Sequence, residues 1–305
     1  MKNKLNWKVL SVIIVGILVL FSSVLVVKHS NEKESVKKYP IRVVTSMDFY
    51  NEVAKSVAGK YGKTTSFINN TGIDPHEYEP STKQAKQLST ANLVIENGLG
   101  YDAWLQKMSK ANGHSQTVVN VAKLMHKHEG DNEHIWYDPQ TMSRLAQNLA
   151  LKYGKIDPKH QKYYQERAKK YQNYMVPLKD KINVARRLVN HNKLTVYTTE
   201  PVFDYALKNL GYKIGNPKFS KAIEDDNDPS PKELAKMKNG IKHHQIAFIV
   251  DNIQSGNATT KSVVKLAQKE GVPVLKVTEN NPKKQTYREW MINEYDQLIK
   301  IQRRQ

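Results

Sequence analysis

The sequence predicts an α/β protein with two lobes, each built on a mainly parallel sheet, joined by one long rigid helix. Short apolar runs alternate with amphipathic segments in both halves, which is typical of crossover units and parallel strands. The middle of the chain carries a single apolar stripe at helical spacing. A length of 305 residues suits two lobes. We expect an N-terminal lobe over 40–156, a connecting helix over 157–190 and a C-terminal lobe over 191–305.

The first half contains three predicted strands, over residues 41–45, 64–68 and 91–96. A helix is expected from Asp48, with Gly59 as its C-terminal stop. Ser81 is a plausible N-cap for a second helix, and residues 101–110 predict a third. Residues 69–80 are rich in Asn, Gly and Pro and predict a loop.

The connecting segment predicts one helix face packed against a partner surface. Its apolar residues are separated by gaps that alternate between four and three positions. They are Tyr164, Ala168, Tyr171, Met175, Leu178, Ile182, Ala185 and Val189. Pro177 lies inside this stripe and lacks a backbone N–H donor, so a kink is expected there.

Strand–helix alternation resumes in the second half. Strands are predicted over 194–198, 246–251 and 272–277. Helices are predicted over 201–210 and 258–270, and a last helix ends the chain. Ligands of α/β sheets gather beyond the carboxyl ends of the strands, so a ligand shared by both lobes is expected in the cleft between them.

The first thirty residues differ from all that follows. Residues 9–27 are almost wholly apolar, and such a stretch can just cross a bilayer as a helix. Lys2, Lys4 and Lys8 precede it and favour a cytoplasmic N-terminus. A cleaved signal peptide is the alternative, but no good small-x-small cleavage site follows Phe21. We expect residues 1–30 to be an uncleaved membrane anchor on the extracellular face of the cell membrane, followed by a polar tether over 31–39.

Composition excludes several kinds of site and partner. The chain has no cysteine, which rules out disulfides, thiolate ligands and a lipid-modified cysteine. A net charge of +19 is typical of proteins that bind nucleic acid. However, the lysines are spread along predicted helix faces, and no compact basic cluster is interleaved with aromatic residues. We therefore expect no nucleic-acid partner.

Four side chains lie at strand ends or in the loops that follow them: His76, His134, Glu200 and Asp251. Imidazole nitrogens and carboxylate oxygens without sulfur suit Zn²⁺ or Mn²⁺. Two ligands from each lobe would place the metal between the lobes. Each residue also has an ordinary alternative, since a loop histidine is often a surface residue and a strand-end aspartate is often a helix cap.

Three segments resemble the solute-binding proteins of zinc and manganese ABC importers. They are residues 70–80 (NTGIDPHEYEP), 134–139 (HIWYDP) and 198–205 (TTEPVFDY), within a similarity that runs from about 41 to 290. The resemblance implies two α/β lobes bridged by a rigid helix, with the metal held between them. It also implies that His76, His134 and Glu200 are ligands. Histidine is common at the third position in the zinc branch and glutamate in the manganese branch, so Glu200 favours manganese.

The fourth ligand departs from the family pattern. The family usually supplies a carboxylate after the buried strand of the second lobe, and Asp251 is the best candidate there, although it comes early on the strand. Gln254 or Asn252 could offer an amide oxygen instead. The proline that usually precedes the second ligand histidine is Glu133 in this chain.

These features together predict a monomeric extracellular binding protein that captures Zn²⁺ or Mn²⁺ and delivers it to an ABC permease. We do not expect an enzyme, because the ligands would fill the coordination shell. An exported metal-dependent hydrolase is the alternative if the fourth position stays open to water, although the sequence has no H-E-x-x-H or G-x-S-x-G motif. An adhesin for anionic envelope polymers is a further alternative, suggested by the basic surface.

Overall fold

The computed structural model describes residues 39–305 except 70–71, 74, 114–115, 255 and 283–284. The expected anchor over 1–30 and nearly all of the tether over 31–39 lie outside the described residues. Within the described part of the chain, no helix combines the length and the apolar character that crossing a membrane requires.

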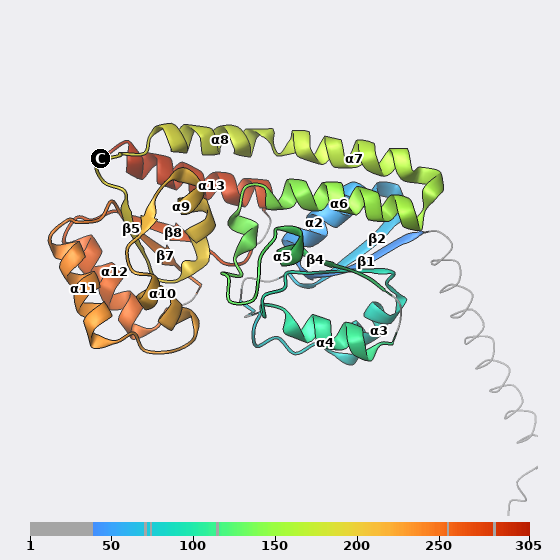
Figure 1. Cartoon of the computed structure of the whole chain (residues 1–305), viewed down its shortest axis with the longest axis horizontal. Coiled ribbons are helices and arrows are strands. Elements are labelled where there is room, and N and C mark those ends of the chain that lie inside the picture. The colour runs from blue at the N-terminus through green and yellow to red at the C-terminus, as the bar shows by residue number, and fades with distance from the viewer. Residues whose placement is uncertain (1–38, 70–71, 74, 114–115, 255, 283–284) are drawn as a thin grey trace, which may run out of the picture.

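Each lobe is built on a four-stranded parallel sheet (Figure 1). The first sheet has the order β2-β1-β3-β4, with strands Ile41–Met47 (β1), Gly62–Ile68 (β2), Leu93–Glu96 (β3) and Thr117–Asn120 (β4). The second has the order β6-β5-β7-β8, with strands Thr195–Thr198 (β5), Lys213–Ile214 (β6), Ile249–Asn252 (β7) and Val274–Val277 (β8). All six strand pairs are parallel. The predicted fold class is confirmed.

The helices of the first lobe begin and end for local reasons that the sequence contains. They are Asp48–Ala58 (α2), Thr82–Thr90 (α3), Ala103–Ala111 (α4), Val121–Leu124 (α5) and Thr141–Ile156 (α6). Gly59 ends α2 at a φ of 53°, where a side chain would also collide with Tyr163. Ser81 begins α3 through a capping box with Gln84.

The connecting segment forms two consecutive helices that run along the long axis of the molecule (Figure 1). They span Gln161–Tyr174 (α7) and Val176–Arg187 (α8) and are separated at Met175. Pro177 occupies the first turn of α8, where its missing N–H donor is tolerated. Every residue of the predicted apolar stripe is buried. The break between α7 and α8 therefore lies close to Pro177, where the sequence predicted a kink.

The second lobe carries the helices Asp204–Leu210 (α9), Pro217–Glu224 (α10), Pro231–Lys242 (α11), Ala258–Lys269 (α12) and Tyr287–Gln302 (α13). The last of these contacts the first lobe. The hydroxyl of Tyr287 donates to the carbonyl oxygen of Trp136 at 2.5 Å, and its backbone N–H donates to the Glu52 carboxylate at 2.8 Å. Trp290 packs near Phe49, with ring centroids 6.0 Å apart. Through α13 the two lobes share one hydrophobic core.

A buried carboxyl group connects α13 to the end of β8. The Oε1 atom of Glu294 accepts from the indole N–H of Trp290 at 2.8 Å and from the backbone N–H of Thr278 at 3.0 Å. The hydroxyl of Tyr137 lies 3.1 Å from the same oxygen. Burial raises the pKa of Glu294 to about 8.

We predict that Glu294→Gln makes the protein more stable at pH 8. Between the ordinary pKa of 4.5 and the folded value of about 8, the unfolded chain is ionised while the folded protein holds the proton. The free energy of unfolding therefore falls as pH rises through this window. Glutamine keeps a neutral acceptor at Oε1, so a gain of roughly 1–3 kcal/mol at pH 8 is expected. Urea unfolding at pH 5 and pH 8 measures it.

The exposed Glu166 on α7 offers a control, since Glu166→Gln should leave the pH dependence of stability as it is in the wild type. If Glu294→Gln and the wild type lose the same free energy between pH 5 and pH 8, the buried proton assigned to Glu294 does not exist.

Candidate metal centre

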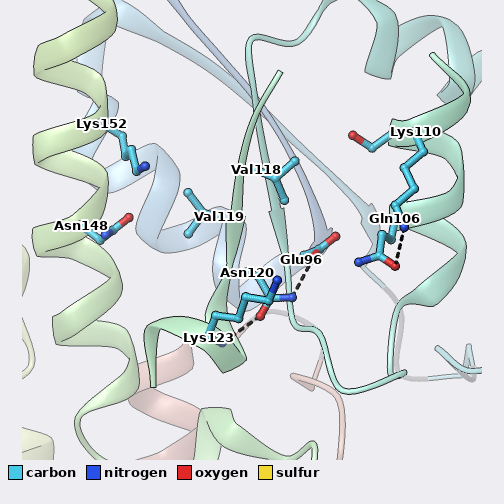
Figure 2. A pocket seen from close by; sticks show the side chains of 10 residues that line it. Glu96, Gln106, Lys110, Val118, Val119, Asn120, Lys123, Asn148 and Lys152 are labelled. Atoms are coloured by element: carbon cyan, nitrogen blue, oxygen red, sulfur yellow. Dashed lines mark hydrogen bonds between the residues drawn. The ribbon is translucent and has the colours of Figure 1, made fainter. Parts of the chain in front are cut away.

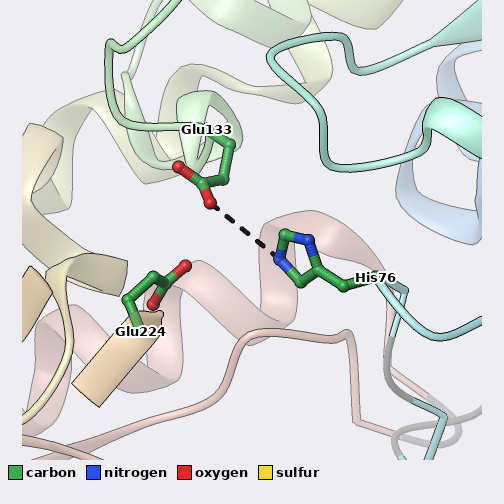
Figure 3. A group of neighbouring side chains, drawn as sticks. All are labelled: His76, Glu133 and Glu224. Carbon is green, nitrogen blue, oxygen red and sulfur yellow. Dashed lines mark ion pairs between the residues drawn. The ribbon is translucent and has the colours of Figure 1, made fainter. Parts of the chain in front are cut away.

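Loops from both lobes bring imidazoles and carboxylates together at the lobe interface. His76 lies in the loop after β2, and Glu133 and His134 lie between α5 and the 3₁₀ turn Ile135–Tyr137. From the second lobe, Glu224 is the last residue of α10, and Glu279 comes two residues after β8. Figure 3 shows His76, Glu133 and Glu224 pointing toward one another.

The distances place three of these side chains around one common point and His134 next to one of them. One ligand atom from each of His76, Glu133 and Glu224 lies within 4.8 Å of the other two. The Nε2 atom of His76 is 3.9 Å from Glu133 Oε1. The Nε2 atom of His134 is 3.5 Å from Glu224 Oε1 and 3.9 Å from Glu279 Oε1. Donor atoms of the kinds that bind Zn²⁺ and Mn²⁺ therefore surround a single place.

Asn132 fixes the orientation and tautomer of the His134 ring. Its Oδ1 atom accepts from the backbone N–H of His134 at 2.8 Å and lies 2.9 Å from His134 Nδ1. Because Oδ1 is an acceptor, Nδ1 carries the ring proton and Nε2 keeps its lone pair. The side chain of His134 is completely buried, and its Nε2 atom has no hydrogen-bond partner. An imidazole held this way is prepared to bind a cation.

The protonation states of the cluster also suit a cation. Burial lowers the pKa of His134 to about 3, with smaller contributions from His76 and Lys221, so this ring is neutral at physiological pH. Burial, together with the nearby carboxylates of Glu133, Glu279 and Glu200, raises the pKa of Glu224 to about 10. Without a cation Glu224 is protonated. A metal ion entering the cluster would displace that proton.

The predicted third ligand, Glu200, lies beside this cluster. It follows β5 and is buried, and its Oε2 atom accepts from Asn252 Nδ2 at 2.5 Å. Its charge contributes to the raised pKa of Glu224. Of the residues that the sequence suggested, His76, His134 and Glu200 are therefore gathered in one region.

The structure does not bring Asp251 to the cluster. Successive side chains of a strand point to opposite faces, and Asn252 already faces Glu200. Asp251 consequently points toward α12 and lines a surface groove with Lys265 and Lys276. Asp251 lies away from the cluster because successive side chains of β7 alternate between the two faces of the sheet. The prediction from sequence did not take this alternation into account.

The alternative fourth ligand, Gln254, supports a neighbouring loop. Its Oε1 atom accepts from the backbone N–H of Asn280 at 2.6 Å. Asn280 in turn donates from Nδ2 to the carbonyl oxygen of Ile73 at 3.0 Å, in the loop that carries His76. The first bond lies within the second lobe, and the second bond connects the loop of Glu279 to the first lobe.

Glu279 is the carboxylate that the sequence analysis missed. It follows a buried strand of the second lobe as Asp251 does, but the strand is β8 rather than β7. The ring of Tyr101 lies nearby. Burial, and then the charge of Glu279, raise the pKa of the Tyr101 hydroxyl. The sequence did contain a signal for Glu279, because it is a carboxylate that closely follows the strand predicted over residues 272–277.

A second hollow, at the edge strand β4, has a different chemical character (Figure 2). Its lining includes Lys110, Lys123 and Lys152 with the carboxylate of Glu96, which accepts from Asn120 Nδ2 at 2.8 Å. Three lysines beside one paired carboxylate do not favour a cation. The interlobe cluster is the better candidate for a metal centre.

Comparison with known proteins identifies the family. The family model of the periplasmic zinc-uptake complex component A, ZnuA, matches residues 43–301. The chain belongs to the ZnuA family. The manganese ABC transporter substrate-binding lipoprotein PsaA of Streptococcus pneumoniae is 25% identical over 278 residues, which cover 85% of this chain and 86% of PsaA.

Two further proteins are similar to this chain. The high-affinity zinc uptake system protein ZnuA of Bacillus subtilis is 25% identical over 229 residues, covering 68% of this chain and 70% of that protein. The solved structure of the periplasmic zinc-binding protein TroA from Treponema pallidum is 17% identical. It covers 86% of this chain and 99% of TroA with a TM-score of 0.70, so it supports the fold.

The expected membrane anchor requires correction. PsaA is named a lipoprotein, a class held at membranes by attached lipid rather than by a spanning helix. Within the described ranges of this ZnuA-family chain, no helix could cross a bilayer. The prediction of an uncleaved helix that holds the chain at the extracellular face was therefore wrong.

We predict that Asn132→Ala weakens binding of Zn²⁺ and Mn²⁺ roughly 10–100-fold, because the ring of His134 loses the acceptor that orients it. Isothermal titration calorimetry measures the effect. Asn173→Ala, on the exposed face of α7, is the control and should bind as the wild type does. Wild-type affinity in Asn132→Ala would show that His134 needs no such support.

Proposed function

We propose that this chain is the substrate-binding protein of an ABC importer, which captures Zn²⁺ or Mn²⁺ and delivers it to the permease as a monomer. The observation that carries the proposal is the grouping of His76, Glu133 and Glu224 from both lobes around one point, with the buried His134 Nε2 atom 3.5 Å from Glu224 and 3.9 Å from Glu279. The names of PsaA and the Bacillus subtilis ZnuA, a manganese and a zinc protein, support the same two metals.

The proposed ligands are His76 and His134 from the first lobe and Glu200 and Glu279 from the second. Two neutral imidazoles and two carboxylates balance the charge of a divalent cation. Glu279 replaces Asp251 in this set, because the side chain of Asp251 lies near Lys276 on the opposite face of the sheet. Ligands from both lobes allow the bound metal to hold the lobes together, which gives a permease a distinguishable loaded state.

Capture fits this chemistry better than catalysis does. A catalytic zinc site keeps an open position for water, whereas this cluster supplies more carboxylates than four-coordination needs. Family membership favours the binding protein over the exported hydrolase and the envelope adhesin.

We predict that Zn²⁺ and Mn²⁺ each raise the melting temperature of the purified protein. A ligand that binds only the folded state stabilises it by about 2.7 kcal/mol at a concentration 100 times its Kd. His76→Ala should remove most of this shift. His243→Ala, at an exposed helix end, should retain it. The proposal fails if neither metal shifts the wild-type melting temperature, or if the two variants lose the shift equally.

We also predict that Glu279→Gln and Asp251→Asn behave differently. Removing one ligand charge from Glu279 should lower Zn²⁺ and Mn²⁺ affinity at least about tenfold, as loss of even a supporting group does. Asp251→Asn is a matched change on the neighbouring strand and should have no effect on affinity. Metal titrations of both variants decide between the two carboxylates, and a loss confined to Asp251→Asn would restore the set expected from the sequence.

A further inference from the structure

Two carboxylates at the centre lie beyond the proposed four ligands. Glu133 comes from the first lobe and Glu224 from the second, and both side chains are largely buried, with exposures of 12% and 8%. Glu133 stands next to His76, and Glu224 stands next to His134. In Figure 3 the two carboxylates and the imidazole of His76 face the same space.

An independent observation points to a cation among these carboxylates. The Nε2 atom of His134 is completely buried and has no hydrogen-bond partner, although the ring is fixed through Nδ1 by Asn132. Its lone pair is directed toward Glu224 at 3.5 Å and Glu279 at 3.9 Å. A buried imidazole nitrogen that lacks a hydrogen-bond partner and is aimed at carboxyl oxygens is an arrangement that a bound cation would satisfy.

The carboxyl group of Glu224 meets that of Glu133 rather than pairing with the lysine on its own helix. Lys221, one turn earlier on α10, forms its ion pair with Asp225 at 2.5 Å. Asp225 and Lys221 are exposed, whereas Glu224 is directed inward from the last position of the helix. Glu224 therefore faces the centre, while the charges next to it face solvent.

We propose that Glu133 and Glu224 are additional metal ligands that select Mn²⁺ against Zn²⁺; this inference rests on the proposed metal capture. They raise the number of available carboxylates from two to four, so that six side chains can supply ligands. These are His76, His134, Glu133, Glu200, Glu224 and Glu279. Zn²⁺ sites are mostly four-coordinate and tetrahedral, whereas Mn²⁺ accepts six ligands and prefers oxygen.

Selection by ligand number is needed because identical donors bind Zn²⁺ more tightly than Mn²⁺. Two more carboxylates increase the affinity for Mn²⁺ more than the affinity for Zn²⁺, because Mn²⁺ accepts six ligands and Zn²⁺ is mostly four-coordinate. They also come from opposite lobes, so the enlarged ligand set spans the lobe interface.

The experiment uses the full chain and compares Glu224→Gln and Glu133→Gln with the wild type. Kd values for Mn²⁺ and Zn²⁺ are measured by competition with a chelator, and the Mn²⁺ coordination number is measured by X-ray absorption. We expect Glu224→Gln to raise the ratio of the Mn²⁺ Kd to the Zn²⁺ Kd at least about tenfold and to lower the coordination number. Glu133→Gln should change the ratio in the same direction. Asp225→Asn, an exposed neighbour, is the control and should keep the wild-type ratio.

Equal losses for both metals in Glu224→Gln and Glu133→Gln would overturn the selective role, and unchanged affinities would overturn the assignment as ligands. Both variants replace oxygen by nitrogen without a change of size, and unfolding curves show that they are folded. A wild-type protein that binds neither metal would instead overturn the proposed function itself, so the two failures are distinguishable.

Discussion

The structure depends on one buried imidazole whose lone pair faces carboxylates across the lobe interface. His134 Nε2 has no hydrogen-bond partner, and Asn132 holds the ring so that it points at Glu224 and Glu279. In the absence of a cation this arrangement is costly, because His134 Nε2 remains a buried acceptor without a hydrogen bond. A divalent metal removes that cost. The same contact explains why the ligands must come from two lobes and why the fold needs a fixed connection between them.

That connection comes from the C-terminal part of the chain as much as from the joining helices. α7 and α8 run the length of the molecule, and α13 lies along α8 and reaches the first lobe through Tyr287 (Figure 1). Glu294 ties α13 to Thr278, the residue before Glu279. The position of Glu279, a proposed metal ligand, therefore depends on a buried carboxyl group in the next helix of the chain.

Much of this could be predicted from the sequence, and the exceptions have physical causes. Long apolar runs predicted the central strands. Motifs indicated His76, His134 and Glu200 as ligands, and that role stays a prediction. The edge strand β4 has one buried residue and β6 has none, so neither contains the buried apolar run that reveals a central strand in the sequence. Asp251 was named and Glu279 was missed because the order of strands in space, and the face on which a strand-end residue points, depend on tertiary packing. Glu133 was noted as an unusual residue, but its approach to Glu224 joins positions far apart in the chain.

Anomalous X-ray diffraction from crystals of the metal-loaded protein tests the central claim most directly. With data collected at the manganese and zinc absorption edges, the account predicts one strong peak between the lobes, within bonding distance of His76 Nε2 and His134 Nε2 and of the Glu279 carboxylate. A peak elsewhere, with His134 Nε2 still facing empty space or water, would contradict it.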